Sequence, residues 1–207
     1  MKNLKNNLKT EFEEYEKALQ DMGFSFICRV DDVGRGPWAG PITACAVILN
    51  SQLSVFKKYG VMDSKQLTEK KREEIFEKLI NEKCLIYNIA NISAEEIDKI
   101  GLGQANYLVL RRAIEGLSQI PDYILVDGFV VKGLNMRHER IIKGDQKVLS
   151  IAAASIIAKV SRDRYMIELS KKFPHYGFED HKGYGTKKHQ EAIKKFGASE
   201  AHRSTFL

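Results

Sequence analysis

The alternation of apolar and polar positions along the chain predicts five strands. Short apolar runs bounded by turn residues are typical of buried strands. They occur at 24–30, 42–49, 84–91, 123–127 and 139–143. The first two flank a glycine-rich turn, DDVGRGPWAGP. Because only this turn separates them, we expect these two strands to pair with each other and to be central in the sheet.

Apolar residues that recur every three or four positions predict the helices. Residues 1–22 have this pattern and are predicted to form a helical appendage that docks on the rest of the chain. Thr68 is a suitable N-cap for a helix over 68–81. Further helices are predicted over 92–117, with a glycine break, over 145–173, and over 189–196.

The order of these elements predicts an α/β fold with a mixed sheet and flanking helices, because the strands gather early and helices lie between and after them. The chain has 207 residues, which suits one domain, placed at 23–207 after the appendage. A dinucleotide-binding fold is disfavoured. Gly34, Gly36 and Gly40 lead into an apolar, strand-like run, whereas that fold needs its glycines to open a helix.

Charge and composition narrow the class of protein. The formal net charge is +6, which favours a polyanionic partner such as nucleic acid. The three cysteines lie far apart in apolar stretches, which argues against a disulfide framework or a CxxC site. No apolar run approaches the ~18 residues of a membrane span, and no apolar signal-peptide centre is present near the N-terminus. We therefore expect a cytoplasmic protein.

Carboxylates at strand ends and on the long helix are the first candidates for chemistry. They are Asp31, Asp32, Asp127 and Asp163. On the helix, Ser155 and Lys159 precede Asp163 at four-residue spacing. Each carboxylate could instead cap a turn or pair with a nearby lysine. Together, in a basic chain, they favour a site for Mg²⁺ and a phosphodiester substrate, since Mg²⁺ prefers oxygen ligands and often binds substrate phosphate as well.

Glycine-rich and basic segments supply candidates for substrate contacts. In the turn Gly34-Arg35-Gly36, glycines let the backbone approach a ligand and arginine adds a charged fork, although a simple tight turn is the alternative. Ser64 and Lys65 could bind phosphate or merely belong to a helix cap. Two later loops carry Lys143 and Tyr184. Tyr184 could stack on a sugar or base, and an ordinary solvated loop is the alternative.

Five segments of the chain form an ordered set: DDVGRGPWAGP, DSKQLTEKKRE, PDYILVDG, KGDQKVLSIAAASIIAKVSRDR and HKGYGTKKHQEAIKKFG. In order and spacing this set resembles bacterial type II ribonuclease H (ribonuclease HII), over residues 24–205. The resemblance implies a ribonuclease H-like fold with a C-terminal helical extension from about residue 165. It also implies a metal-dependent endoribonuclease that cleaves the RNA strand of RNA–DNA hybrids. Such an enzyme incises 5′ of single ribonucleotides in duplex DNA and takes part in ribonucleotide excision repair.

Carried over position by position, the resemblance implies a role for each candidate. The catalytic carboxylates, which would bind two Mg²⁺ or Mn²⁺ ions, are Asp31, Asp32, Asp127 and Asp163. The substrate-binding residues would be Gly34, Arg35, Gly36, Ser64, Lys65, Lys143 and Tyr184. The glycine-arginine-glycine turn would contact the 2′-hydroxyl, which distinguishes RNA from DNA. The tyrosine would pack on the neighbouring sugar. We expect RNA–DNA hybrids and ribonucleotide-containing duplex DNA as partners, with no obligate protein partner, no membrane, and the protein as a monomer.

The chain departs from the family pattern at one position. The family usually has Asp-Glu before the glycine-arginine-glycine turn, and this chain has Asp31-Asp32. Aspartate is one methylene shorter, and Mg²⁺ requires ligand distances of ~2.0–2.1 Å. One alternative is therefore a catalytically impaired variant that binds hybrids. Another is a different nuclease of the same fold, such as a resolvase, which would not require the 2′-hydroxyl.

Overall fold

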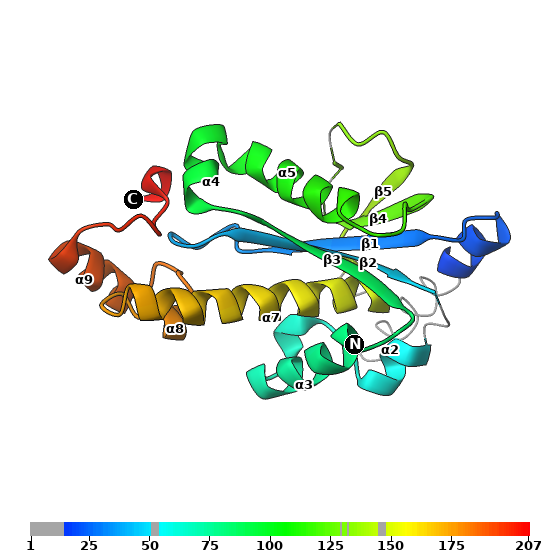
Figure 1. Cartoon of the computed structure of the whole chain (residues 1–207), viewed down its shortest axis with the longest axis horizontal. Helices are drawn as coiled ribbons and strands as arrows, with labels where there is room; N and C mark the ends of the chain where they lie inside the picture. Colours follow the sequence, from blue (N-terminus) through cyan, green and yellow to red (C-terminus); the bar gives the residue numbers. More distant parts are fainter. Residues whose placement is uncertain (1–14, 51–53, 129, 132, 145–147) are drawn as a thin grey trace.

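The computed structural model describes residues 15–50, 54–128, 130–131, 133–144 and 148–207. Its strands form one sheet in the order β3-β2-β1-β4-β5 (Figure 1). They are β1 (Ile27–Val33), β2 (Ile42–Leu49), β3 (Leu85–Ile92), β4 (Tyr123–Asp127) and β5 (His138–Ile141). β1 is central and pairs with β2, which confirms the prediction for the first two strands.

The sheet is mixed, as predicted. β1 pairs antiparallel with β2, and β2 pairs antiparallel with β3. β4 runs parallel to β1 and to β5. The parallel pair β1 and β4 determines the position of the site, because parallel strands place their carboxyl ends at the same edge of the sheet.

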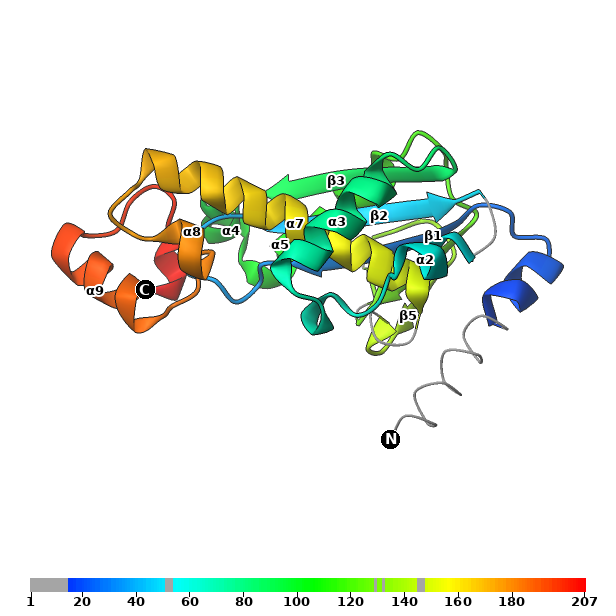
Figure 2. The same cartoon turned by 90° about the horizontal axis from the view of Figure 1, so that it is seen from below.

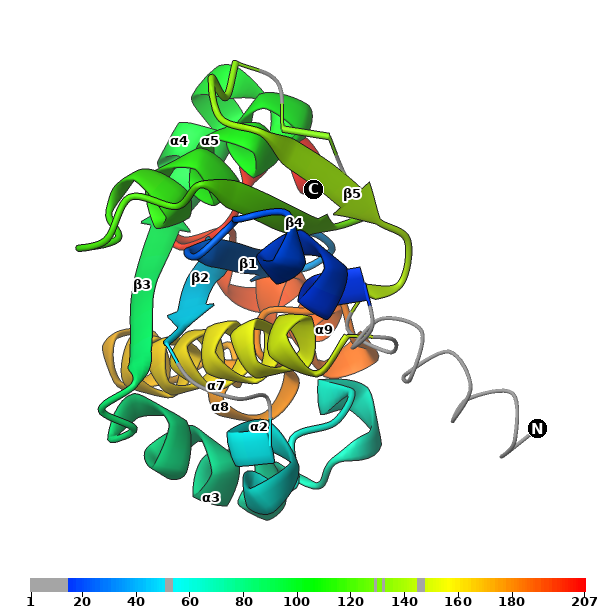
Figure 3. The ribbon, with the colours of Figure 1, turned by 90° about the vertical axis from the view of Figure 1, so that its right-hand side faces the viewer.

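Helices cover both faces of the sheet. α4 (Ala94–Ile100) and α5 (Leu102–Glu115) lie on one face, and α7 (Leu149–Lys172) lies on the other (Figures 1 and 3). Outside α7 lie α2 (Ser54–Tyr59) and α3 (Glu69–Ile80), as the view from below also shows (Figure 2). The remaining elements are η1 (Ser64–Gln66), α8 (Phe178–His181), α9 (Lys187–Phe196) and η2 (Ser204–Phe206).

Local signals explain most helix boundaries. The Thr68 hydroxyl accepts a hydrogen bond from Lys71 N and caps α3, as predicted. Ser93 and Glu96 form a capping box at the start of α4, and Gly101, with φ 78°, is the predicted break between α4 and α5. The last helix begins earlier than predicted, because Thr186 caps it. The helices α2 and α8, of 6 and 4 residues, were not predicted, since they are too short for a periodic pattern.

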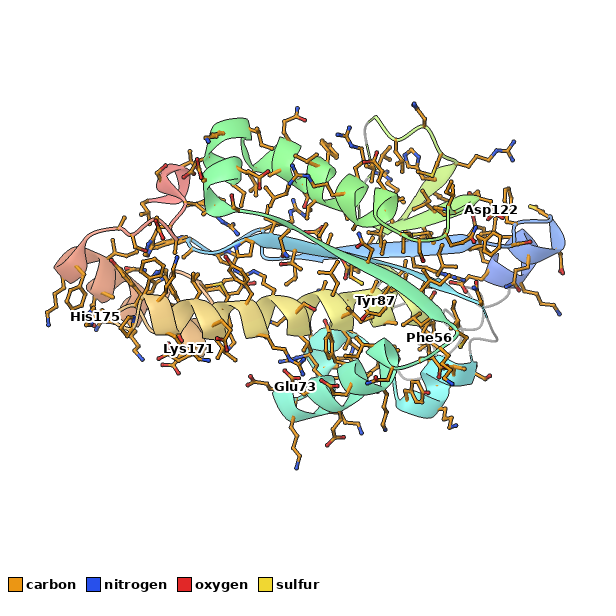
Figure 4. The ribbon with its side chains drawn as sticks, in the orientation of Figure 1. Phe56, Glu73, Tyr87, Asp122, Lys171 and His175 are labelled. Carbon is orange, nitrogen blue, oxygen red and sulfur yellow. The ribbon has the colours of Figure 1, made fainter. Side chains whose placement is uncertain are left out.

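Small residues let α7 pack closely on the sheet. Ala152, Ala153 and Ala154 are buried in one apolar cluster with Cys45 and Val47 of β2. The predicted helix began at residue 145, and residues 145–147 lie outside the described part of the chain. Phe56 of α2, which is labelled in Figure 4, belongs to the same cluster and is fully buried. None of the helices in the described ranges is long and apolar enough to cross a membrane.

Residues 15–21 are helical and pack at one end of the sheet (Figure 3). Glu16 is buried, and its carboxylate accepts hydrogen bonds from Arg29 Nη2 at 2.7 Å and from Ser150 Oγ at 2.6 Å. Leu19 is buried beside them. The remainder of the predicted appendage, residues 1–14, lies outside the described part of the chain.

Candidate active site

Asp31 and Asp127 are neighbours where the parallel pairing of β1 and β4 ends. β1 itself continues to Val33 along β2, so this strand begins and ends three residues later than predicted. In the parallel pair, Val30 lies opposite Val126, and each aspartate is the next residue of its strand. Burial raises the pKa of Asp31 well above its usual range, and the charges of Asp127 and Asp32 raise it further. The strand pairing therefore brings like charges together at one edge of the sheet.

Two hydrogen-bond donors fix the Asp31 carboxylate, one from β1 itself and one from α7. Asp32 N donates to Asp31 Oδ1 at 2.7 Å, and the Ser155 hydroxyl of α7 also binds this carboxylate. Ser155 Oγ lies 3.0 Å from Ser64 Oγ in η1. Ser64, predicted on the phosphate side, thus contacts the carboxylate site through Ser155.

Asp32 has a buried oxygen, Oδ2, without a hydrogen-bond partner among the described residues. Burial raises the pKa of Asp32 to about 6; the Arg35 guanidinium opposes this rise and the Asp127 charge adds to it. A buried acceptor without a donor is costly unless a proton or a cation satisfies it. Asp32 is therefore suited to bind a cation.

Asp127 is oriented by the segment that follows β5. Gly144 N donates to Asp127 Oδ1 at 2.6 Å. A Cβ at Gly144 would lie 2.6 Å from Ile151 Cδ1 and 3.2 Å from that carboxylate oxygen, so a larger residue would require both side chains to shift. Lys143, next to it, is exposed and has a positive φ of 57°.

Asp163 is paired with a lysine on its own helix. Lys159 Nζ lies 2.7 Å from Asp163 Oδ1, one turn earlier on α7. Lys159 lines the same cavity as the strand-end carboxylates, whereas Asp163 is not among the cavity's lining residues. The cavity therefore groups Asp31, Asp32 and Asp127, whereas Asp163 is paired with Lys159 and is outside the cavity lining.

A cavity of about 320 Å³ contains these groups. Its lining residues are Asp31, Asp32, Val33, Arg35, Ser64, Lys65, Arg72, Asp127, Ser155, Lys159 and Tyr184. Of the predicted site residues, Gly34, Gly36, Lys143 and Asp163 are outside this lining. The cavity combines acidic residues from the sheet with basic residues from the surrounding loops and helices.

The segment that carries the glycine-arginine-glycine turn, residues 34–41, is bound by two buried arginines that were not predicted. Arg162 of α7 donates to Pro41 O, Lys182 O and Ala39 O, and Arg203, near the C-terminus, donates to carbonyls of the turn. Gly34 has φ 94°, and a Cβ there would lie 2.2 Å from Arg162 Nε. Glycine is therefore required both by backbone conformation and by space.

Tyr184 lies beside the turn and is 43 % exposed. A Cβ on Gly36 would be 3.7 Å from its ring, which is ordinary van der Waals contact. Its carbonyl is bound by His189 Nδ1 at 2.9 Å, and His189 Nε2 lies 3.0 Å from His202 Nε2. Burial lowers the pKa of His189 to about 4, so both rings are neutral at pH 7 and support the tyrosine loop.

The chemistry of these side chains suits a divalent cation. The unsatisfied Asp32 Oδ2 and the repulsion between carboxylates are both relieved by a positive charge, and carboxylate oxygens are the ligands that Mg²⁺ and Mn²⁺ prefer. Within the described ranges, no three His, Cys, Asp or Glu side chains are already spaced to hold one ion together. The described carboxylates therefore fit a divalent cation by their chemical type and by their proximity.

Comparisons with a family model, with individual sequences and with solved structures all match this chain to ribonucleases H of type II. The family model for ribonuclease HII matches residues 29–207. A ribonuclease HII of Caldicellulosiruptor bescii is 49 % identical over 94 % of this chain and 92 % of its own length. One from Clostridium botulinum is 52 % identical over 87 % of this chain and 67 % of its own. The crystal structure of ribonuclease H2 from Pyrococcus horikoshii OT3 has a TM-score of 0.74 and 29 % identity, covering 87 % of this chain and 93 % of that one.

The sheet order, the helices on both faces and the carboxylates at the ends of β1 and β4 define an enzyme of the ribonuclease H fold. Its matches extend over nearly the whole chain. This chain belongs to the ribonuclease HII family and is an endoribonuclease. The resemblance in the sequence motifs is thereby confirmed.

Replacing Asp32 with asparagine should stabilise the metal-free protein at pH 8. The folded chain disfavours the ionised carboxylate, so this group lowers stability as the pH rises from about 4 to above 6. Removing the charge should raise the free energy of unfolding by about 1–2 kcal/mol at pH 8, after allowance for partial exposure. The difference should shrink toward pH 4.

Urea unfolding in EDTA between pH 5 and 8 measures this difference. Asp21→Asn, at an exposed carboxylate, is the control and should show no such trend. Added Mn²⁺ should stabilise the parent protein more than Asp32→Asn. An asparagine variant that is equally or less stable than the parent at pH 8 would show that the Asp32 charge is not disfavoured.

Proposed function

We propose that this enzyme cleaves the RNA strand of RNA–DNA hybrids and incises on the 5′ side of single ribonucleotides in duplex DNA. The products would carry 3′-hydroxyl and 5′-phosphate ends. One observation carries the proposal: a single cavity contains the strand-end carboxylates together with Arg35 and Tyr184. Groups suited to phosphodiester chemistry therefore lie beside groups suited to reading a sugar. The ribonuclease HII name of the relatives supports the same substrate class.

Asp31, Asp32 and Asp127 would hold divalent cations, Mg²⁺ or Mn²⁺, with Asp163 as a further ligand. When bound, two such ions activate a water and stabilise the leaving oxygen of the scissile phosphodiester. Asp163 would have to exchange its ion pair with Lys159 for this role. Lys159 would then be free to interact with a substrate phosphate, since it already lines the cavity.

Basic residues around the carboxylates would position the substrate backbone. Lys65 lines the cavity and Ser64 is anchored to α7 through Ser155, so both lie where a phosphate next to the cleavage site would be. Arg72 donates to Ser64 O and Leu67 O and thereby fixes this segment. Lys143 is exposed and outside the cavity lining, and the next residue, Gly144, binds Asp127. This position would suit contact with a more distant phosphate. Such contacts position a duplex without reading its sequence.

Recognition of the ribonucleotide would come from the turn and the tyrosine. Gly36 is small and exposed, so a hydroxyl on the sugar could hydrogen-bond to the backbone there, whereas Gly34 is buried against Arg162 and gives the turn its shape. Tyr184 packs beside Gly36 and is partly exposed, so it can lie against the adjoining sugar. A resolvase-like activity would leave these two features without a use, and the comparisons give no support to a catalytically impaired variant.

Cleavage of a duplex that contains one ribonucleotide tests the proposal directly. We expect a single cut on the 5′ side of the ribonucleotide in the presence of Mg²⁺ or Mn²⁺, and none in EDTA. An all-DNA duplex of the same sequence should stay intact, and mapping of the termini should find a 3′-hydroxyl. Equal cleavage of both duplexes would instead support a nuclease that ignores the 2′-hydroxyl.

Arg35→Ala and Tyr184→Ala should each reduce discrimination between a ribonucleotide and a deoxyribonucleotide by about tenfold or more, since one stacking or sugar contact is worth ~1–3 kcal/mol. Binding to all-DNA duplex should change much less, because phosphate contacts remain. Binding and cleavage are compared at one salt concentration. Tyr165→Ala, at an exposed tyrosine of α7, is the matched control. Equal losses on both duplexes would refute a role in recognition.

Asp32→Glu should increase Mg²⁺-supported cleavage, because the longer side chain reaches a metal without displacing the other ligands. A misplacement of ~1 Å can cost about a hundredfold in rate, which sets the upper limit of the gain. The gain should be smaller in Mn²⁺, which also suits oxygen ligands. Single-turnover cleavage in each metal measures the effect, and thermal unfolding verifies the fold. If Asp32→Glu is no faster in Mg²⁺, aspartate already reaches the metal well enough.

A further inference from the structure

The C-terminal residues return to the glycine-arginine-glycine turn and bind its backbone. Arg203 is fully buried. Its guanidinium donates to Gly34 O at 2.6 Å and to Arg35 O at 3.1 Å. Two further hydrogen bonds reach Gly40 O, at 3.0 and 2.8 Å. One side chain therefore binds the carbonyls of both ends of the segment that carries the recognition turn.

Packing alone does not require an arginine at this buried position. A buried charge is unfavourable unless hydrogen bonds compensate it, and an apolar side chain of similar size is often no less stable. Within the described residues, Arg203 forms no ion pair with a carboxylate, and its hydrogen bonds all go to carbonyls. Burial lowers the pKa of Arg203, and the charge of the nearby Arg162 lowers it further. The guanidinium fork instead specifies geometry, because it can bind several carbonyls in fixed directions.

Asp98 of α4 fixes the chain segment that carries Arg203. Asp98 Oδ2 accepts hydrogen bonds from Ser204 N at 2.7 Å and Ser204 Oγ at 2.8 Å. Asp98 Oδ1 accepts from Thr205 N at 3.1 Å and Thr205 Oγ1 at 2.7 Å. On the other side, Arg203 N donates to Trp38 O at 2.8 Å. The C-terminus lies beside α4 in Figure 1, consistent with these contacts.

We propose that Arg203 and Asp98 are positioning residues for ribonucleotide recognition: Arg203 shapes the Gly34-Arg35-Gly36 turn through its carbonyls, and Asp98 fixes Arg203 in place. Neither residue lines the cavity, so both act through the turn. The inference rests on the proposed function, since it assigns the turn to the sugar. It adds that selectivity depends on a helix on the face of the sheet opposite α7.

Asp98→Ala tests the proposal, because it removes all four acceptor contacts from a partly exposed position. We expect kcat/KM on the one-ribonucleotide duplex to fall about tenfold, since small misplacements of a recognition group carry such losses. The Kd for an all-DNA duplex should stay within about twofold of the parent value, because phosphate contacts are unaffected. Amide hydrogen exchange at residues 34–40 should become faster.

Glu95→Ala, on the same helix and exposed, is the matched control and should behave as the parent in each measurement. Arg203→Lys, which keeps the charge but loses the fork, should show the same selective loss, with thermal unfolding to verify its fold. If Arg203→Lys does not fold, Asp98→Ala decides the question.

Two results would overturn the positioning role. One is parent-like kcat/KM in a folded Asp98→Ala, and the other is an equal loss on one-ribonucleotide and all-DNA duplexes. A parent enzyme that leaves the one-ribonucleotide duplex uncut overturns the proposed function and this inference with it. Parent cleavage with unaffected variants overturns the positioning role alone.

Discussion

The parallel pairing of β1 and β4 forces two carboxylates together at one edge of the sheet, and the rest of the site compensates for their repulsion. Asp31 and Asp127 cannot separate without breaking the register of these strands. Burial disfavours the ionised form of Asp31, and the charge of Asp127 repels it, so the pKa of Asp31 is raised. Backbone N–H groups of Asp32 and Gly144 donate to them. What remains uncompensated is negative charge, which favours cations.

Compensation by protons and by lysine keeps this site stable until a cation binds. Raised pKa values at Asp31 and Asp32 mean that both carboxyls keep their protons to a higher pH than an ordinary aspartate does. The ammonium of Lys159 neutralises Asp163 in the same way. A metal that binds these carboxylates must therefore displace protons and a lysine, so its affinity rises with pH. The repulsion that weakens the free enzyme thus drives metal binding.

The strand and helix pattern predicts the sheet, its central pair and most helices, because periodicity reports burial directly. It also places Asp31 and Asp127 at strand ends, from which their proximity follows once the strands are parallel. The four-residue spacing of Lys159 and Asp163 anticipates their ion pair. It does not tell whether Asp163 forms this pair or joins the other carboxylates in the cavity, and the structure has the ion pair. Arg162 and Arg203 were missed for a physical reason: a buried arginine that binds carbonyls has no sequence signature, since its partners are backbone atoms of remote segments.

The carboxylates and the proposed recognition turn belong to different elements, so side chains that connect these elements must keep them in register. The carboxylates belong to the sheet, whose geometry is fixed by strand pairing, whereas the turn is a loop that strand pairing alone would leave free to move. Arg162 binds the loop from α7, the helix that also carries Asp163, and Arg203 binds it from the C-terminal segment. A shift of α7 would therefore displace a candidate metal ligand and the recognition turn together. In the proposed function, catalysis and sugar recognition would therefore share one rigid support, which would keep the scissile phosphate and the 2′-hydroxyl in a fixed relation.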